Sequence, residues 1–281
     1  MILTYPEGLQ GKALLQHLHS NKSDFIKAKK VGLKFADPVC YGVAGDGKAG
    51  LFMQKAKAID MVAPTDEDPN LRVTVVANMS GWMDSQDDVL LRGCYDKTLR
   101  DKGNNFYFLR DHRYSIEAII AKTEKVYTRD FSPMELGITT TATVNPQGLI
   151  FVGLLTEDMS DKVYYMYKEG LINQHSIGLR YIRIDLAIND PDFTSEFKTW
   201  TQFKGQVLNI GEAEAQGFFW AVQEIELLEN SAVLFGANIL TPTLAVEEAK
   251  TGAVIDTPKA EAVKDTSKEQ EKKPFSHYNL F

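Results

Sequence analysis

Long β-type segments place the strongest constraint on how this chain can fold. Apolar and β-branched side chains dominate residues 171–184 and 218–235, and residues 71–78 (Leu-Arg-Val-Thr-Val-Val-Ala-Asn) alternate as a half-buried strand does. Shorter strands are predicted at residues 106–110, 138–144 and 149–155. Helical patterns with suitable end residues occur at residues 8–30, 93–102 and 161–169. The chain is therefore expected to combine a β-rich core with several short helices.

The composition changes toward both ends of the chain. Residues 63–70 are rich in acidic and turn-forming residues, which is typical of an exposed loop or linker. From about residue 245, Ala, Glu, Lys, Thr and Pro dominate, and such a segment buries too little apolar surface to offset its ordering entropy. The aromatic-rich end, residues 275–281, is either a docking peptide or an accidental tail. We predict an N-terminal helical extension at 1–70, one domain at 71–244 and a flexible tail with an aromatic C-terminal peptide at 245–281.

Charge and motif content argue against several classes of protein. The formal net charge of −7 argues against a nucleic-acid binder, which neutralises phosphates with excess Lys and Arg. No apolar run reaches the ~18 residues of a membrane span, and the N-terminus lacks the pattern of a secretory signal. Cys40 and Cys94 give neither a disulfide framework nor paired metal ligands. The loop with Asp84, Asp87 and Asp88 matches no calcium-loop spacing, so we interpret it as solvated.

The chain also contains no Walker loop, dinucleotide fingerprint or HExxH motif. Together with the composition, this leads us to expect no cofactor, no metal, no nucleic-acid partner and no membrane partner. Few cysteines are typical of a reducing, cytoplasmic setting.

Residues 174–179 (Gln-His-Ser-Ile-Gly-Leu) place a serine inside a β-type run. Serine is a weak nucleophile that needs a base within hydrogen-bond reach and a group that orients the base. Because side chains alternate between the two faces of a strand, Ser176 shares a face with Gly178 and Arg180, whereas His175 points to the other face. His175 is therefore not expected to serve Ser176. Gly178 leaves backbone open on the serine's face, which would suit the close approach of a substrate chain.

His112 is the better candidate for the base. It ends the apolar segment 106–112 (Phe-Tyr-Phe-Leu-Arg-Asp-His), and a polar, turn-like stretch follows it. A side chain that emerges from the end of a rigid strand is well placed for catalysis.

Two further segments accompany the serine and histidine strands. Residues 84–99 hold an acidic loop followed by an Asp-Lys-Thr-Leu helix start, and residues 225–238 contain Glu-Asn-Ser-Ala-Val. Taken in order, the four segments resemble the tailed-phage (Caudovirales) prohead protease family, which is related to the assemblin-like herpesvirus capsid-maturation proteases. The resemblance runs from about Arg72 to Thr243, and residues 185–206 look like an insertion relative to shorter members. Members usually carry an acidic residue after the histidine, whereas here Asp111 precedes His112.

The resemblance implies an α+β fold, a mostly antiparallel β-barrel flanked by helices as in the herpesvirus proteases. It implies a serine endopeptidase of phage capsid maturation that cuts scaffold or capsid-protein segments, and itself, inside the procapsid in the host cytoplasm. Ser176 would attack the peptide carbonyl, His112 would act as general base, and Glu229 would orient His112. Backbone N–H groups would form the oxyanion hole, with Arg180 and neighbouring loops as candidates for placing them. The major capsid protein or the scaffold would be the partner, and a homo-oligomer is compatible with the relatives.

Two other functions remain open from the sequence. The first is a non-enzymatic scaffolding or capsid-interior protein that retains the protease fold, which the N-terminal extension and the tail would suit. The second is a small-ligand-binding β-barrel.

Overall fold

The computed structural model describes residues 5–6, 8–32 and 70–249. The predicted aromatic peptide at 275–281 and most of the predicted linker and tail lie outside these residues. Within the described part of the chain, no helix is long and apolar enough to cross a membrane.

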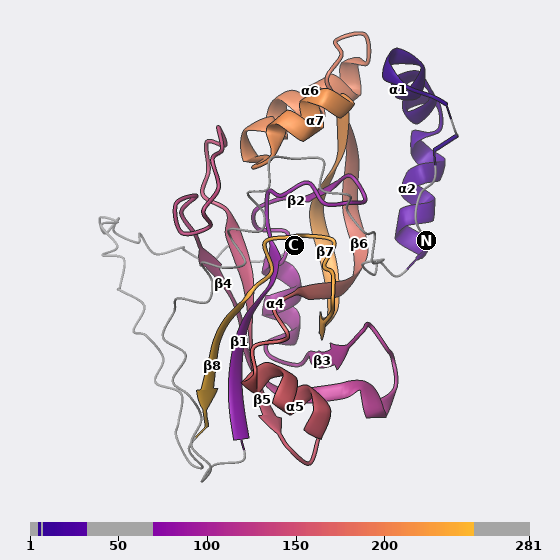
Figure 1. Cartoon of the computed structure of the whole chain (residues 1–281). Helices are drawn as coiled ribbons and strands as arrows, with labels where there is room; N and C mark the ends of the chain where they lie inside the picture. Colours follow the sequence, from indigo (N-terminus) through magenta and orange to yellow (C-terminus); the bar gives the residue numbers. More distant parts are fainter. Residues whose placement is uncertain (1–4, 7, 33–69, 250–281) are drawn as a thin grey trace, which may run out of the picture. The chain divides into compact units, whose positions relative to one another are not determined.

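Eight strands form one mixed sheet (Figure 1). The pairing order is β2-β7-β3-β4-β5-β1-β8, and β6 pairs with β7. β2 and β3 run parallel to β7, whereas the other pairs are antiparallel. The strands are β1 (Asn70–Met79), β2 (Asp88–Leu90), β3 (Tyr107–Arg110), β4 (Ile119–Asp130), β5 (Gln147–Thr156), β6 (His175–Ile188), β7 (Phe218–Ala232) and β8 (Thr243–Glu248).

The predicted α+β class is confirmed, but the sheet is open and mixed rather than a closed antiparallel barrel. β1 lies close to β6. Both edges of β1 are already occupied, by β5 on one side and β8 on the other. No hydrogen-bonded ladder therefore joins β1 to β6 among the described strands.

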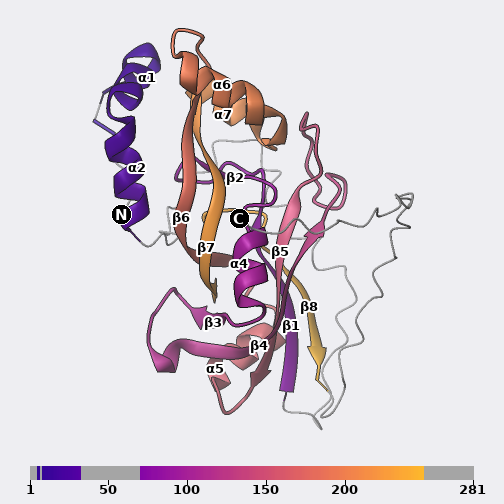
Figure 2. The same ribbon diagram turned by 180° about the vertical axis from the view of Figure 1, so that it is seen from behind.

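Helices of the described residues pack against the sheet in four places. α1 (Gly11–Ser20) and α2 (Lys22–Val31) run alongside β6, and α6 (Thr194–Phe203) and α7 (Ile210–Gln216) sit where β6 turns into β7, as Figures 1 and 2 show. α4 (Asp96–Lys102) packs against β7, and α5 (Asp161–Lys168) packs against β1 and β5. α4 ends at Gly103, whose φ of 59° and ψ of −121° form a conformation that glycine, having no Cβ, adopts readily.

One large apolar core lies between these elements. It draws buried side chains from all eight strands, among them Phe108, Phe151, Leu179 and Trp220. Removing such large side chains from water is the main driving force for folding. The core therefore holds β3, β6 and β7 in fixed positions, and these are the strands that carry the predicted catalytic residues.

Several predicted boundaries are corrected. The threonine-rich residues 138–144 form no strand, and the long strand β4 was not expected. Residues 185–206, which look like an insertion relative to shorter members of the resembled family, comprise the end of β6, which continues to Ile188, and the helical segment that follows it. The tail was predicted from residue 245, but β8 pairs with β1 up to Glu248 and Val246 is buried. The domain therefore extends beyond 244, because β8 covers an edge of β1.

Ion pairs hold the N-terminal helices against the rest of the domain. Lys22 Nζ lies 2.9 Å from Glu196 Oε1 on α6, and Lys29 Nζ lies 2.6 Å from Asp88 Oδ1 on β2. The Lys29–Asp88 pair is buried, and the Lys29 ammonium also lies over the rings of Tyr181 and Trp220. The described helices of the extension are thus packed against the domain.

The acidic loop is buried, which corrects its interpretation as a solvated loop. Asp88 is fully buried and Asp84 nearly so. Asp84 Oδ1 accepts the backbone N–H groups of Gln86 and Asp88, and the Tyr5 hydroxyl donates to Asp87. The carboxylates are tolerated inside because hydrogen bonds and the Lys29 ammonium compensate for the lost water.

Lys29→Ala is expected to lower the free energy of unfolding by about 3–5 kcal/mol, since it removes the cation beside a fully buried carboxylate. Lys27→Ala is the matched control, because Lys27 pairs with Asp24 on the exposed face of the same helix and such surface pairs contribute little. Urea unfolding of the two variants measures the difference. Equal stabilities would show that the Lys29–Asp88 contact does not hold the extension.

Candidate functional site

The order of three strands brings the predicted site residues together. β7 lies between β6 and β3, and the registers place Ser176 opposite Ser231, Gly178 opposite Glu229, and Tyr107 beside Glu229. The C-terminal end of β3 therefore lies next to the C-terminal half of β7. The segments that carry His112, Ser176 and Glu229, which are far apart in the sequence, are brought to the same end of the sheet.

His112 and Glu229 are in direct contact. His112 Nδ1 lies 2.7 Å from Glu229 Oε1, and both side chains are buried, Glu229 completely. An ionised carboxylate can only accept, so Nδ1 carries the proton in this contact. The basic lone pair of the neutral ring is then on Nε2, which is the tautomer that a general base requires.

The turn that presents His112 has an unusual backbone. Asp111 and His112 have φ values of 53° and 51°, in the left-handed region that residues other than glycine seldom adopt. Two hydrogen bonds to β7 hold this turn: Asp111 N–H to the carbonyl of Ala232 at 3.0 Å, and His112 N–H to Ser231 Oγ at 3.1 Å. Such strained residues persist only where their surroundings fix them, and they cluster at functional sites.

Ser231 is a site residue that the sequence analysis did not single out. Its hydroxyl donates to Glu229 Oε2 at 2.7 Å, and the residue is fully buried. The available signal was its position two residues after Glu229, which puts both side chains on the same face of β7.

Ser176 lies on that same face of the β6–β7 pair. Opposed residues of antiparallel strands point to the same side, and the register from Ser176 to Gly178 has no bulge. On this face, the Ser176–Ser231 pair is therefore next to the Gly178–Glu229 pair, and Glu229 in turn contacts His112. Among the hydrogen bonds of the described residues, none joins Ser176 to His112.

Gly178 has a different role from the one expected. A Cβ there would lie 2.3 Å from Glu229 Oε1 and 2.7 Å from the Tyr114 hydroxyl. The space over Gly178 is therefore filled by Glu229 and Tyr114, so it does not receive a substrate backbone. Burial and the Glu229 charge raise the pKa of Tyr114 to about 12, which keeps its phenol protonated beside the carboxylate.

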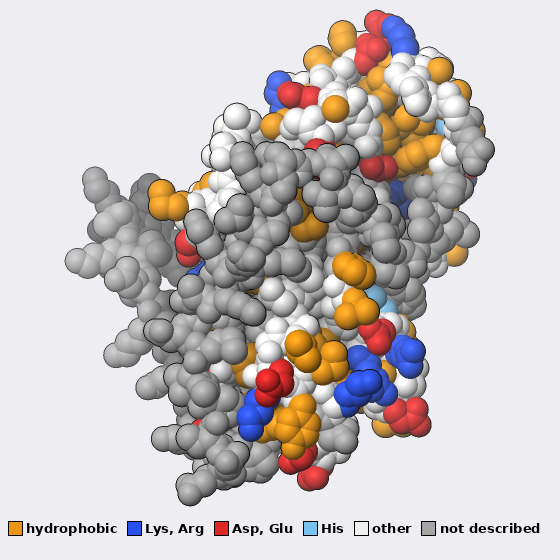
Figure 3. All heavy atoms as spheres, viewed as in Figure 1, with side chains coloured by type: hydrophobic (Ala, Val, Ile, Leu, Met, Phe, Trp, Pro, Cys, Tyr) orange, Lys and Arg blue, Asp and Glu red, His pale blue; other side chains and the backbone are white. Residues whose placement is uncertain are grey.

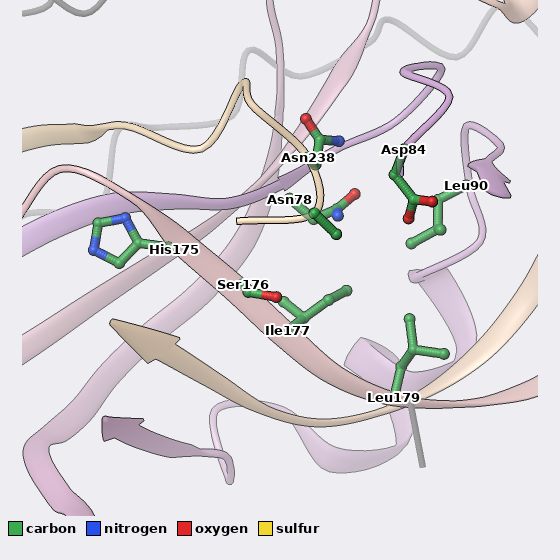
Figure 4. A pocket seen from close by; sticks show the side chains of 9 residues that line it. Asn78, Asp84, Leu90, His175, Ser176, Ile177, Leu179 and Asn238 are labelled. Atoms are coloured by element: carbon green, nitrogen blue, oxygen red, sulfur yellow. The ribbon is translucent and has the colours of Figure 1, made fainter. Parts of the chain in front are cut away.

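His175 occupies the opposite face, as strand alternation predicted. It is fully buried, its Nε2 lies 2.9 Å from the Tyr167 hydroxyl, and its Nδ1 lies 2.9 Å from the carbonyl oxygen of Thr241. In Figure 4, His175 and Ser176 leave the strand in opposite directions. Burial lowers the pKa of His175 to about 4, so its ring is a neutral part of the core near pH 7.

A small pocket adjoins Ser176 (Figure 4). Asn78 and Asn238 line it from the neighbouring segments, and the acidic loop contributes Asp84. The asparagine side chains are anchored, Asn78 by the Tyr95 hydroxyl and Asn238 by the carbonyl of Met79. The pocket wall is thus polar and rigid on the side that Ser176 faces.

The surface around the site is mixed in character. Figure 3 shows a histidine between hydrophobic, basic and acidic side chains, close to where β3 ends in Figure 1. The large exposed apolar residues of the adjoining segments are Tyr107, Tyr114, Leu234 and Phe235. Arg180 lies 3.1 Å from Glu226 on β7 and is half exposed, so its guanidinium is engaged with that carboxylate.

No group of three or more His, Cys, Asp or Glu side chains in the described residues is arranged to hold a metal ion. Cys94 is a buried core residue, and burial raises the pKa of its thiol. Comparison with known proteins gives no match among protein-family models, curated proteins or solved structures.

Gly178→Ala is expected to reduce any activity of this site by about 100-fold, the scale of a 1 Å displacement of catalytic groups. Tyr114 can swing away from the new methyl group, but the buried Glu229 carboxylate must shift and lengthen its contact with His112. Gly211→Ala is the control, because a Cβ there meets nothing within 4 Å. Rates of any activity and melting temperatures are compared, and an unimpaired Gly178→Ala variant would show that the space over Gly178 does not position Glu229.

Proposed function

We propose that this chain is a serine endopeptidase in which Ser176 is the nucleophile, His112 the general base and Glu229 the group that orients the base. The 2.7 Å contact between His112 Nδ1 and Glu229 Oε1, on the strand face that carries Ser176, is the observation that supports it best. A base and its buried orienting carboxylate beside a serine form the arrangement that nucleophilic acyl transfer requires.

The chemistry follows from this arrangement. Ser176 Oγ attacks a peptide carbonyl while His112 Nε2 takes its proton, and Glu229 stabilises the imidazolium that forms. His112 then donates the proton to the leaving amine, and a water activated by the same nitrogen hydrolyses the acyl-enzyme. Side-chain rotation on substrate binding would close the Ser176–His112 hydrogen bond, since catalytic contacts are often loose in the free enzyme.

We place this activity in phage capsid maturation. The four ordered segments that resemble prohead proteases support this setting, with scaffold or capsid-protein segments as substrates and the procapsid in the host cytoplasm as the location. The proposal includes self-cleavage in the part of residues 245–273 that follows β8, and an ancestral relation of the open sheet to the herpesvirus protease barrel. The proximity of β1 and β6 supports that relation.

Co-expression tests the proposal against a purely scaffolding role. The chain is produced together with a phage capsid protein and a scaffold protein as candidate substrates, as wild type, His112→Ala and His19→Ala. His19 lies on α1 and pairs with Glu196, remote from the site. We expect shortened products with wild type and His19→Ala, and full-length proteins with His112→Ala. Identical products from all three would favour a scaffolding protein that retains the fold.

A further inference from the structure

We propose that Ser231 is a positioning residue that orients the ring of His112 through the Glu229 carboxylate and holds the backbone of His112 directly. This role rests on the proposed function and adds a fourth member to the site. It is inferred from three hydrogen bonds that link Ser231, Glu229 and His112 in a ring.

The direction of each hydrogen bond is determined by chemistry. The backbone N–H of His112 can only donate, so Ser231 Oγ accepts at that 3.1 Å contact. The single hydroxyl proton of Ser231 is then directed to Glu229 Oε2, 2.7 Å away. Ser231 is fully buried, so bulk water does not compete for either contact.

The three contacts form a closed ring. Glu229 Oε1 accepts from the imidazole of His112, and Glu229 Oε2 accepts from Ser231, which in turn holds the backbone of His112. A rotation of the carboxylate would break both contacts at once. The same serine stabilises the left-handed backbone at His112, whose φ is 51°. Ser231 therefore couples the turn geometry to the orientation of the base.

The same geometry excludes Ser231 as the nucleophile. Its proton is directed to Glu229 Oε2, and the residue is completely buried. Ser176, directly opposite on β6, is also buried but retains 6% exposure and lines the pocket. The two serines thus divide the roles, Ser176 reacting and Ser231 positioning.

Ser231→Ala is expected to lower kcat by about 10- to 100-fold with little change in KM, because the substrate does not touch this residue. Ser231→Thr keeps the hydroxyl at a strand position that favours β-branched residues, so it should restore most of kcat.

Nuclear magnetic resonance of His112 separates this inference from the proposed function, since it needs no turnover. The Nδ1 proton is observed in Ser176→Ala and in the Ser176→Ala/Ser231→Ala and Ser176→Ala/Ser231→Thr variants. We expect a downfield signal that is weakened by the alanine and retained by the threonine. An unchanged signal in the alanine variant would overturn the role of Ser231, as would equal kcat losses in Ser231→Ala and Ser231→Thr. Absence of cleavage by wild type with the expected signals would instead refute only the proposed function.

Discussion

Ser176→Ala is expected to abolish peptide cleavage, with a loss on the order of 10⁶-fold, the scale seen when the nucleophile of a serine protease is removed. The side chain is small and lies at a pocket wall, so its removal leaves the core intact. Product formation from the capsid or scaffold protein, measured by gel and intact mass, gives the rate. Circular dichroism confirms that the variant is folded.

Ser195→Ala is the matched control for this loss, because Ser195 lies exposed on α6. It should cleave as wild type does. Processing by Ser176→Ala at more than a hundredth of the wild-type rate would remove Ser176 from the mechanism and direct attention to another nucleophile.

Glu229→Gln is expected to slow cleavage by about 10⁴-fold, the effect of losing the carboxylate that orients a catalytic histidine. Glutamine has the same size, but it is neutral, and its amide can donate to Nδ1 and stabilise the wrong tautomer of His112. The effect should fall on kcat, because the residue is buried beneath the site.

Glu226→Gln is the control on the same strand, where Glu226 pairs with Lys102 and Arg180 at the surface. His175→Ala provides a second comparison and should slow cleavage only weakly, provided that assays are run where the variant is folded. A Glu229→Gln rate within tenfold of wild type would mean that the contact with His112 is structural.

Sequence patterns within a single strand predicted those features of the candidate site that depend on that strand alone. Alternation along β6 was enough to separate Ser176 from His175, and the apolar run before His112 located the end of β3. The contact between His112 and Glu229 joins residues 117 positions apart. No local pattern determines such a pairing, and only the resemblance to prohead proteases suggested Glu229.

The errors share a physical origin, since each depends on which elements become neighbours. Gly178 was interpreted as open because its own strand offers no side chain, but Glu229 and Tyr114 from other elements fill that space. The acidic loop was interpreted as solvated because its spacing matches no calcium-binding loop. The cation that compensates its buried charge, Lys29, comes from α2, far away in the sequence. Burial of polar residues thus depended on tertiary partners.

Covalent labelling tests the central claim most directly. The wild-type protein and His112→Ala are incubated with a fluorophosphonate, which reacts with serines that an adjacent base activates, and the modified residue is mapped by mass spectrometry. We predict one adduct, on Ser176, that forms rapidly in wild type and is nearly lost in His112→Ala. No adduct on the folded wild-type protein, or an adduct on another serine, would contradict a mechanism built on Ser176, His112 and Glu229.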